Sequence, residues 1–360
     1  MTDATTVSFG STISLAEAAN LVIHCPDNHF LFRGPPGIGK SSLMGTFKEH
    51  FGDAYNYVYF DCINKDLGDI TMPSVNHELK VTEYYPNQVF QMQNGKPCII
   101  MLDEFTKAMQ PIQNMLHPLL EAHNPRLGDM PLPKGSRVLI TGNMASDGVG
   151  DNIKAHTLNR VSVVTVAPPT ADEWLLWAAR NDIDPVVMAW VHRFPHCLDS
   201  YVTSDITSNP YVFNPKVPQT GGFVSPRSLE KVSGITRNRG KLSSNALLAA
   251  VIGTIGASAA KDMEAFIAYQ DELPDWDDVI ASPKTAKLPS SPGACAVMVF
   301  GAVSQVDTNS LAPFMEYVER MDAEWQATFC VQIAKNPAKR DVAFKHRKFA
   351  DWVVANSDIL

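Results

Sequence analysis

The stretch GPPGIGKS at residues 34–41 decides the fold, because it satisfies the pattern G-x-x-x-x-G-K-[ST]. A short, mostly apolar run at 29–33 precedes it and indicates a strand, and residues 41–51 follow it with the pattern of a helix. Glycines let the backbone curl so that successive N–H groups point inward, and the helix that starts at Lys40 adds its positive end. Strand, loop and helix together predict a cradle for phosphate groups.

Similar apolar runs recur at 55–60, 98–102, 138–141 and 161–166, with helical segments between most of them. Such strands, alternating with helices, indicate a parallel sheet covered on both faces. With the run at 29–33, we predict a five-stranded α/β domain of the P-loop NTPase type. A helix over 14–25, with Ser14 as its N-cap, is expected to open the fold.

After Pro168 and Pro169 the pattern becomes helical. We therefore predict an α/β nucleotide-binding core over 1–168, an all-α lid over 169–310 and a helical C-terminal extension over 311–360. The stretch 196–222 lacks a regular pattern and is interpreted as an insertion in the lid.

Composition narrows the class of protein. The 360 residues carry 30 basic and 38 acidic side chains, a net charge of −8 that argues against general coating of nucleic acids. The most apolar stretch, 246–260, is shorter than the roughly 20 residues that a bilayer helix needs, and we expect it to be a buried helix. No export signal is recognised, and six scattered cysteines fit a reducing cytoplasm.

Two carboxylates follow the apolar run at 98–102. Asp103 suits the Mg²⁺ shell together with the Ser41 hydroxyl, and Glu104 is placed to polarise a water against a γ-phosphate. Forty residues after Asp103, another apolar strand ends at Asn143, whose amide could orient that water. Lys40 supplies a point charge to the β- and γ-phosphates.

These motifs resemble those of an AAA+ ATPase of the MoxR branch. GPPGIGKS looks like Walker A, IIMLDE like Walker B, TGN like sensor 1, LNR like an arginine finger and SPR at 225–227 like sensor 2. The resemblance implies that Arg160 reaches the site of a neighbouring subunit, that Arg227 touches the phosphates from the lid, and that the ring is a homo-hexamer. The predicted nucleotide-binding residues are Gly34, Pro35, Pro36, Gly37, Ile38, Gly39, Lys40, Ser41 and Ser42.

The leading hypothesis is an ATP-hydrolysing ring that remodels or assembles a protein partner. Relatives of this kind often work with a protein bearing a von Willebrand factor A domain. Tyr84 and Tyr85, in the segment 81–93, would grip a protein substrate at the ring axis or simply pack on the sheet.

The sequence gives less support to other classes of function. A nucleic-acid motor or loader remains the alternative, because 234–241 and 335–348 are locally basic, although such clusters are more often solvated helix faces. A GTPase would need N-K-x-D for guanine recognition, and NKDL at 64–67 ends in leucine. A non-catalytic scaffold would leave Glu104 or Arg160 dispensable.

Overall fold

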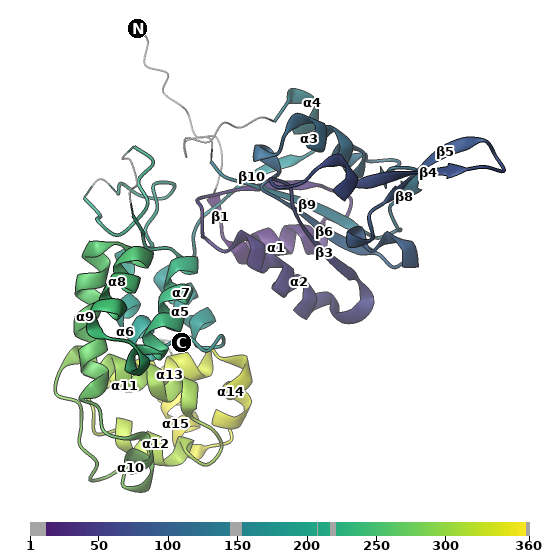
Figure 1. Cartoon of the computed structure of the whole chain (residues 1–360). Helices are drawn as coiled ribbons and strands as arrows, with labels where there is room; N and C mark the ends of the chain where they lie inside the picture. Colours follow the sequence, from purple (N-terminus) through teal and green to yellow (C-terminus); the bar gives the residue numbers. More distant parts are fainter. Residues whose placement is uncertain (1–11, 145–152, 207, 217–220, 358–360) are drawn as a thin grey trace. The chain divides into compact units, whose positions relative to one another are not determined.

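The computed structural model describes residues 12–144, 153–206, 208–216 and 221–357. The chain divides into two compact units, the first comprising Met1–Pro168 with Val202–Ser204 and the second Pro169–Tyr201 with Asp205–Leu360. Each unit is described by itself (Figure 1).

A parallel sheet forms the centre of the first unit. Its strands, within the described residues, are β1 (Thr12–Ile13), β2 (Phe30–Arg33), β3 (Asn56–Asp61), β6 (Cys98–Asp103), β9 (Arg137–Gly142) and β10 (Ser162–Val166). Their order across the sheet is β1-β10-β2-β9-β6-β3. The fold class is as predicted, but the expectation of five strands was wrong: β1 makes six, through the parallel pairing of Thr12 with Thr165. A two-residue strand is too short to produce a hydrophobic pattern.

Both faces of the central strands β2, β9 and β6 are buried, and alternate residues of these strands enter different cores. In β6, Ile99 and Met101 face α1 (Leu15–His24) and α2 (Leu43–Phe51), whereas Ile100 and Leu102 face α3 (Gln110–Leu116). The first helix begins at the predicted N-cap, because the Ser14 hydroxyl accepts from Glu17 N and the Glu17 carboxylate accepts from Ser14 N. The sheet is therefore a rigid platform for the loops at its carboxyl edge.

The first unit also contains several smaller elements outside the central sheet. The strands β4 (Thr71–Asn76) and β5 (Val81–Pro86) form an antiparallel hairpin that extends from the body of the unit (Figure 1). The remaining strands and helix of this unit are β7 (Arg126–Leu127), β8 (Met130–Pro131) and α4 (Ala155–Leu158).

The regular elements of the second unit, within its described residues, are helices. Its helices are α5 (Ala171–Ala178), α6 (Pro185–Arg193), α7 (Pro226–Arg237), α8 (Ser244–Ile255), α9 (Ala257–Asp271), α10 (Trp276–Ala281), α11 (Pro292–Gln305), α12 (Leu311–Val318), α13 (Ala323–Ala334), α14 (Pro337–Ala343) and α15 (Arg347–Ala355). One hydrophobic core runs from Trp174 to Phe349. The segment 311–357 is thus packed into the same core as the preceding helices.

Two segments of this unit bear on the sequence interpretation. In the stretch 196–222, residues 207 and 217–220 lie outside the described residues, and the rest holds the end of a short 3₁₀ turn, Pro195–Leu198. The prediction that 246–260 forms a buried helix was wrong, because Gly256, at φ +85°, separates α8 from α9, and only Val251 and Ile255 of α8 are buried. Among the described residues, no helix has the length and apolarity needed to cross a membrane.

Candidate functional site

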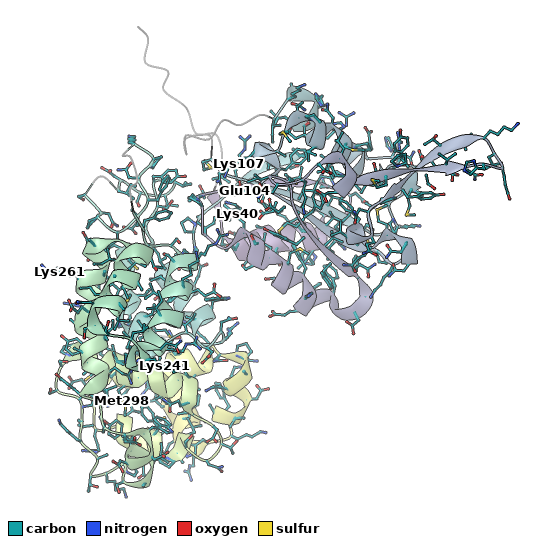
Figure 2. The ribbon with its side chains drawn as sticks, in the orientation of Figure 1. Lys40, Glu104, Lys107, Lys241, Lys261 and Met298 are labelled. Atoms are coloured by element: carbon teal, nitrogen blue, oxygen red, sulfur yellow. The ribbon has the colours of Figure 1, made fainter. Side chains whose placement is uncertain are left out.

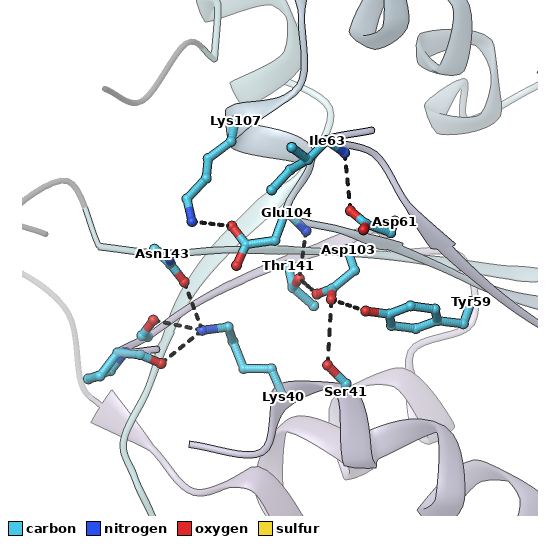
Figure 3. A network of polar contacts seen from close by, with 12 residues as sticks. Lys40, Ser41, Tyr59, Asp61, Ile63, Asp103, Glu104, Lys107, Thr141 and Asn143 are labelled. Atoms are coloured by element: carbon cyan, nitrogen blue, oxygen red, sulfur yellow. Dashed lines mark hydrogen bonds and ion pairs between the residues drawn. The ribbon is translucent and has the colours of Figure 1, made fainter. Parts of the chain in front are cut away.

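The sheet order brings three chemically active loops together. β9 lies between β2 and β6, and the three strands are parallel, so the segments that follow them leave the same edge of the sheet. These segments are the glycine-rich loop, Asn143, and the pair Asp103 and Glu104 (Figure 3). In α/β sheets, this carboxyl edge is where ligands bind.

The glycine-rich loop contains positions at which the backbone conformation or a close contact requires glycine. Gly39 has φ +101°, a left-handed conformation that favours glycine, and it precedes the short 3₁₀ turn Lys40–Ser42 that leads into α2. A Cβ on Gly34 would lie 2.5 Å from the carbonyl oxygen of Val166. The loop can therefore pack closely against the neighbouring strand and still turn sharply into the helix.

Lys40 is buried within this loop. Its Nζ donates to the carbonyl oxygens of Gly34 at 2.7 Å and Pro35 at 3.0 Å, and to Asn143 Oδ1 at 3.3 Å. The ammonium group is thus held where the loop meets the end of β9, as Figure 3 shows. A buried ammonium group at the start of a helix after a glycine-rich loop is suited to binding an anion.

Asp103 ends β6 at the centre of a hydrogen-bond network. Thr141, fully buried on β9, donates its hydroxyl to Asp103 Oδ1, and Tyr59 on β3 donates to Oδ2. Ser41 Oγ donates to the same Oδ2 at 3.5 Å. Partial burial, and then the hydrogen bond to Asp103, raise the pKa of Tyr59 to about 12, so the phenol stays a donor at neutral pH.

The Ser41 hydroxyl and Asp103 carboxylate fit a magnesium ion bound together with nucleotide phosphates. Both are hard oxygen donors, and Mg²⁺ typically takes one or two protein oxygens beside phosphate and water. Among the described residues, no group of three or more His, Cys, Asp or Glu side chains is placed to hold a metal ion. A bound Mg²⁺ would therefore take its other ligands from phosphate and water.

Glu104 sits beside this network in an unusual backbone conformation. Its φ of +52° lies in the left-handed region, which costs a non-glycine residue roughly 1–2 kcal/mol. Its backbone N–H donates to Thr141 Oγ1 at 3.2 Å, and its carboxylate lies 2.7 Å from Lys107 Nζ. Strain of this kind persists where surrounding structure fixes it, which is common at functional sites.

Asn143 follows β9 and directly contacts Lys40, as noted above. Gly142, immediately before it, packs so closely on Thr106 that an added Cβ would lie 2.4 Å from Thr106 Cγ2. The glycine therefore allows β9 to approach the turn after β6. The structure thus brings Lys40, Ser41, Asp103, Glu104 and Asn143 into one site.

Arg160 lies away from that site. It precedes β10, whose Ser162 pairs with Phe30, so it sits at the amino edge of the sheet, opposite the glycine-rich loop. The four-residue strand β2 alone spans about 13 Å between these edges. The guanidinium donates to His156 O at 2.9 Å and lies 3.3 Å from Glu121 Oε1. Arg160 is therefore badly placed to serve the site of its own chain.

Arg227 belongs to the second unit, in the first turn of α7. Ser225 caps this helix through reciprocal hydrogen bonds with Ser228, and Arg227 is exposed. No hydrogen bond or ion pair of its side chain is formed within the described residues. A cation in the first turn opposes the helix dipole, which indicates that stability is not the reason for its position.

The aromatic residues of the segment 81–93 fall into two groups. Tyr84 and Tyr85 lie on the β4–β5 hairpin and are 44% and 45% exposed, whereas Phe90 is fully buried in the core beside Phe60. On the hairpin, Met72, Val75 and Val81 are also exposed. The two tyrosines therefore do not pack within the sheet core.

Three site residues were missed in the sequence. Tyr59 lies in a strand whose alternation gives no hint that its hydroxyl reaches the next strand, Thr141 is the first letter of TGN, and Lys107 follows Glu104 by three residues. Figure 2 locates Lys107 and Glu104 close to Lys40 on the first unit. The TGN motif did carry a signal for Thr141, since a hydroxyl at a strand end can bond neighbouring strands.

Comparison with a known protein family agrees with this geometry. Residues 29–161 match the AAA domain (dynein-related subfamily). Among solved structures, the chain is similar to "a putative ATPase" from Cytophaga hutchinsonii, with 14% identity, a TM-score of 0.35, and coverage of 88% of this chain and 80% of the other. No curated protein matches the chain.

Proposed function

We propose that this chain is a Mg-ATP-dependent ATPase of the AAA+ class that resembles the MoxR branch. We also propose that it works as a homo-hexameric ring. The observation that carries the proposal is the meeting of Lys40, Ser41, Asp103, Glu104 and Asn143 at one sheet edge within the AAA-like segment. Each is a group that phosphoryl transfer to water requires, and they come from three different strands.

The roles follow from the chemistry of each group. The loop N–H groups and Lys40 would bind the β- and γ-phosphates. To do so, the Lys40 ammonium would exchange its hydrogen bonds to the carbonyl oxygens of Gly34 and Pro35 for contacts with the phosphate oxygens, on which negative charge develops during the reaction. Glu104 would accept a proton from the attacking water, which Asn143 would help orient. Bound Mg²⁺ supplies charge neutralisation between the phosphates, and Ser41 and Asp103 would hold it.

The position of Arg160 supports the proposal of a ring. Because Arg160 lies at the opposite edge from its own nucleotide loop, its use as a catalytic arginine requires a neighbouring subunit. A head-to-tail contact of this kind closes into a ring when the rotation permits. Arg227, exposed at the start of α7, would contact phosphate from the lid.

The work of the ring would be to remodel or assemble a protein partner, including one with a von Willebrand factor A domain. The β4–β5 hairpin supports this, because both of its faces carry exposed apolar side chains that a protein partner would cover. Six free thiols, four of them buried, favour a reducing compartment, for which we propose the cytoplasm.

The basic segment 335–348 gives less support to nucleic-acid work. Lys339 donates to the carbonyl oxygens of Ser304 and Val306, and Lys348 Nζ lies 3.2 Å from Glu319 Oε2, just after α12. These two cations are used within the helical unit, whereas Lys335, Arg340, Lys345 and Arg347 are exposed. A protein client is the better proposal because of the exposed apolar side chains on the hairpin.

The test is Glu104→Gln, with Glu49→Gln on the exposed side of α2 as its matched control. Glu104→Gln should keep ATP binding and lose turnover by at least about 100-fold, since the amide cannot accept a proton. With ATP present, it should also retain the protein partner in affinity capture. Turnover unchanged in Glu104→Gln would refute the assignment of the base.

A further inference from the structure

The turn that follows β6 places Lys107 over Glu104. Glu104 is the N-cap of the 3₁₀ turn Phe105–Lys107, and its carbonyl oxygen accepts from Lys107 N at 3.0 Å. In a 3₁₀ turn, side chains three residues apart eclipse each other. The Lys107 side chain therefore returns along Glu104, and its Nζ lies 2.7 Å from Glu104 Oε2.

The backbone on either side of this ion pair is fixed. Phe105 and Thr106 are buried, and Thr106 fills the space that Gly142 leaves open on β9. Glu104 N donates to the buried Thr141 hydroxyl. The pair is thus part of the packed interior edge of the sheet, with side chains only 21% (Lys107) and 25% (Glu104) exposed.

The two oxygens of the Glu104 carboxylate have different surroundings. Oε2 is buried and accepts no hydrogen bond from the described residues, and the Lys107 ammonium lies 2.7 Å away, so the attraction between them is that of an ion pair. In Figure 3 the other oxygen points toward the side on which Lys40 and Asn143 lie. An ordered glutamate gives up as much as about 2 kcal/mol of rotamer freedom. The ion pair with Lys107 favours one orientation of the carboxylate.

We infer that Lys107 is a positioning residue that aims Glu104, by holding Oε2 so that the second oxygen faces the nucleotide. This inference rests on the proposed ATPase function. Lys107 acts through Glu104 and does not itself touch substrate. Because small misplacement of a catalytic group can cost about 10²-fold in rate, loss of the ammonium should lower kcat about 10- to 100-fold. Nucleotide binding, which depends on the glycine-rich loop and Lys40, should change less than about threefold.

The experiment measures kcat, KM and nucleotide affinity of the full chain for Lys107→Met, Lys107→Arg, Glu104→Gln and the double variant Lys107→Met with Glu104→Gln. Lys134→Met, exposed in the turn before β9, is the control with the same charge change. Lys107→Met should lose kcat at unchanged KM while the chain still folds, and Lys107→Arg should recover to within about fivefold of wild type.

The double variant separates positioning from mere stability. On the Glu104→Gln background, Lys107→Met should cause no further loss, because the residue it aims is already disabled. Equal losses of kcat on both backgrounds, a kcat for Lys107→Met equal to that of wild type or higher, or no recovery in Lys107→Arg would each overturn the inference. A wild-type chain without Glu104-dependent hydrolysis would instead refute the proposed function.

Discussion

Replacing Thr141 by valine tests whether its buried hydroxyl fixes both carboxylates of the site. Valine keeps the shape of threonine and removes the oxygen. The hydroxyl donates to Asp103 Oδ1 and accepts from Glu104 N at 3.2 Å, and the residue is fully buried. Valine would therefore leave one carboxylate oxygen and one backbone N–H of the site without this partner.

The size of the effect follows from these two contacts. A hydrogen bond to a charged group contributes about 1.5–3 kcal/mol and a neutral one about 0.5–1.5 kcal/mol, so we expect a loss of about 2–4 kcal/mol in the free energy of unfolding of the first unit. With a urea dependence of about 1–3 kcal/mol per molar, its midpoint should fall by roughly 1 M or more. ATP turnover should fall as well, because Glu104 loses a backbone anchor.

The distribution of tryptophan makes the assay specific. All six tryptophans, Trp174, Trp177, Trp190, Trp276, Trp325 and Trp352, lie in the second unit. Urea unfolding followed by far-UV circular dichroism reports on both units, whereas tryptophan fluorescence reports on the second. Thr141→Val should shift only the dichroism transition, and Thr141→Ser, which keeps the hydroxyl, should shift it less. A Thr141→Val midpoint equal to that of wild type, or an equal shift in fluorescence, would refute the reasoning.

Two further perturbations probe the same edge. Gly142→Ala puts a Cβ 2.4 Å from Thr106 Cγ2, so we expect the free energy of unfolding to fall by about 1–3 kcal/mol, and kcat to fall as well. Thermal or urea unfolding measures the first effect, and a variant as stable as wild type would contradict the close approach of β9 to Thr106. Tyr59 has its pKa raised to about 12, so its contribution to stability is fully present below the ordinary value near pH 10 and is lost as pH rises through about 12. The stability difference between wild type and Tyr59→Phe should accordingly be constant from pH 7 to 9 and narrow above pH 10, which urea unfolding at each pH would reveal; a difference that stays the same to pH 12 would contradict it.

The sequence predicted the sheet well because its central strands are buried on both faces. Continuous apolar runs such as 98–102 favour strands buried on both faces of a parallel sheet, and the polar residues that follow such strands then meet at one edge. By contrast, β1 is held by two backbone pairings and needs no apolar side chains, so the hydrophobic pattern of the sequence does not predict it.

Side-chain partners were harder to predict than strands. Tyr59 reaches Asp103 because β3 is the neighbour of β6, and this adjacency appears only once the strand order is known. Lys107 lies over Glu104 because the turn is 3₁₀; an ordinary loop with the same sequence would leave it in solvent. In α8, strong apolarity suggested burial, but only Val251 and Ile255 of this helix are buried, and the helix ends before Gly256.

We propose that ATP is hydrolysed at this edge of the sheet with Arg160 supplied by a neighbouring subunit. Arg160 and Glu121 form a partly exposed pair worth less than about 1 kcal/mol, so Arg160→Ala should fold normally. The measurement is phosphate release by an equimolar mixture of Lys40→Ala and Arg160→Ala chains, each inactive alone. Random assembly places an intact site beside an intact arginine at about a quarter of the interfaces, so the mixture should regain about a quarter of wild-type activity. A mixture no more active than its separate components would contradict the account.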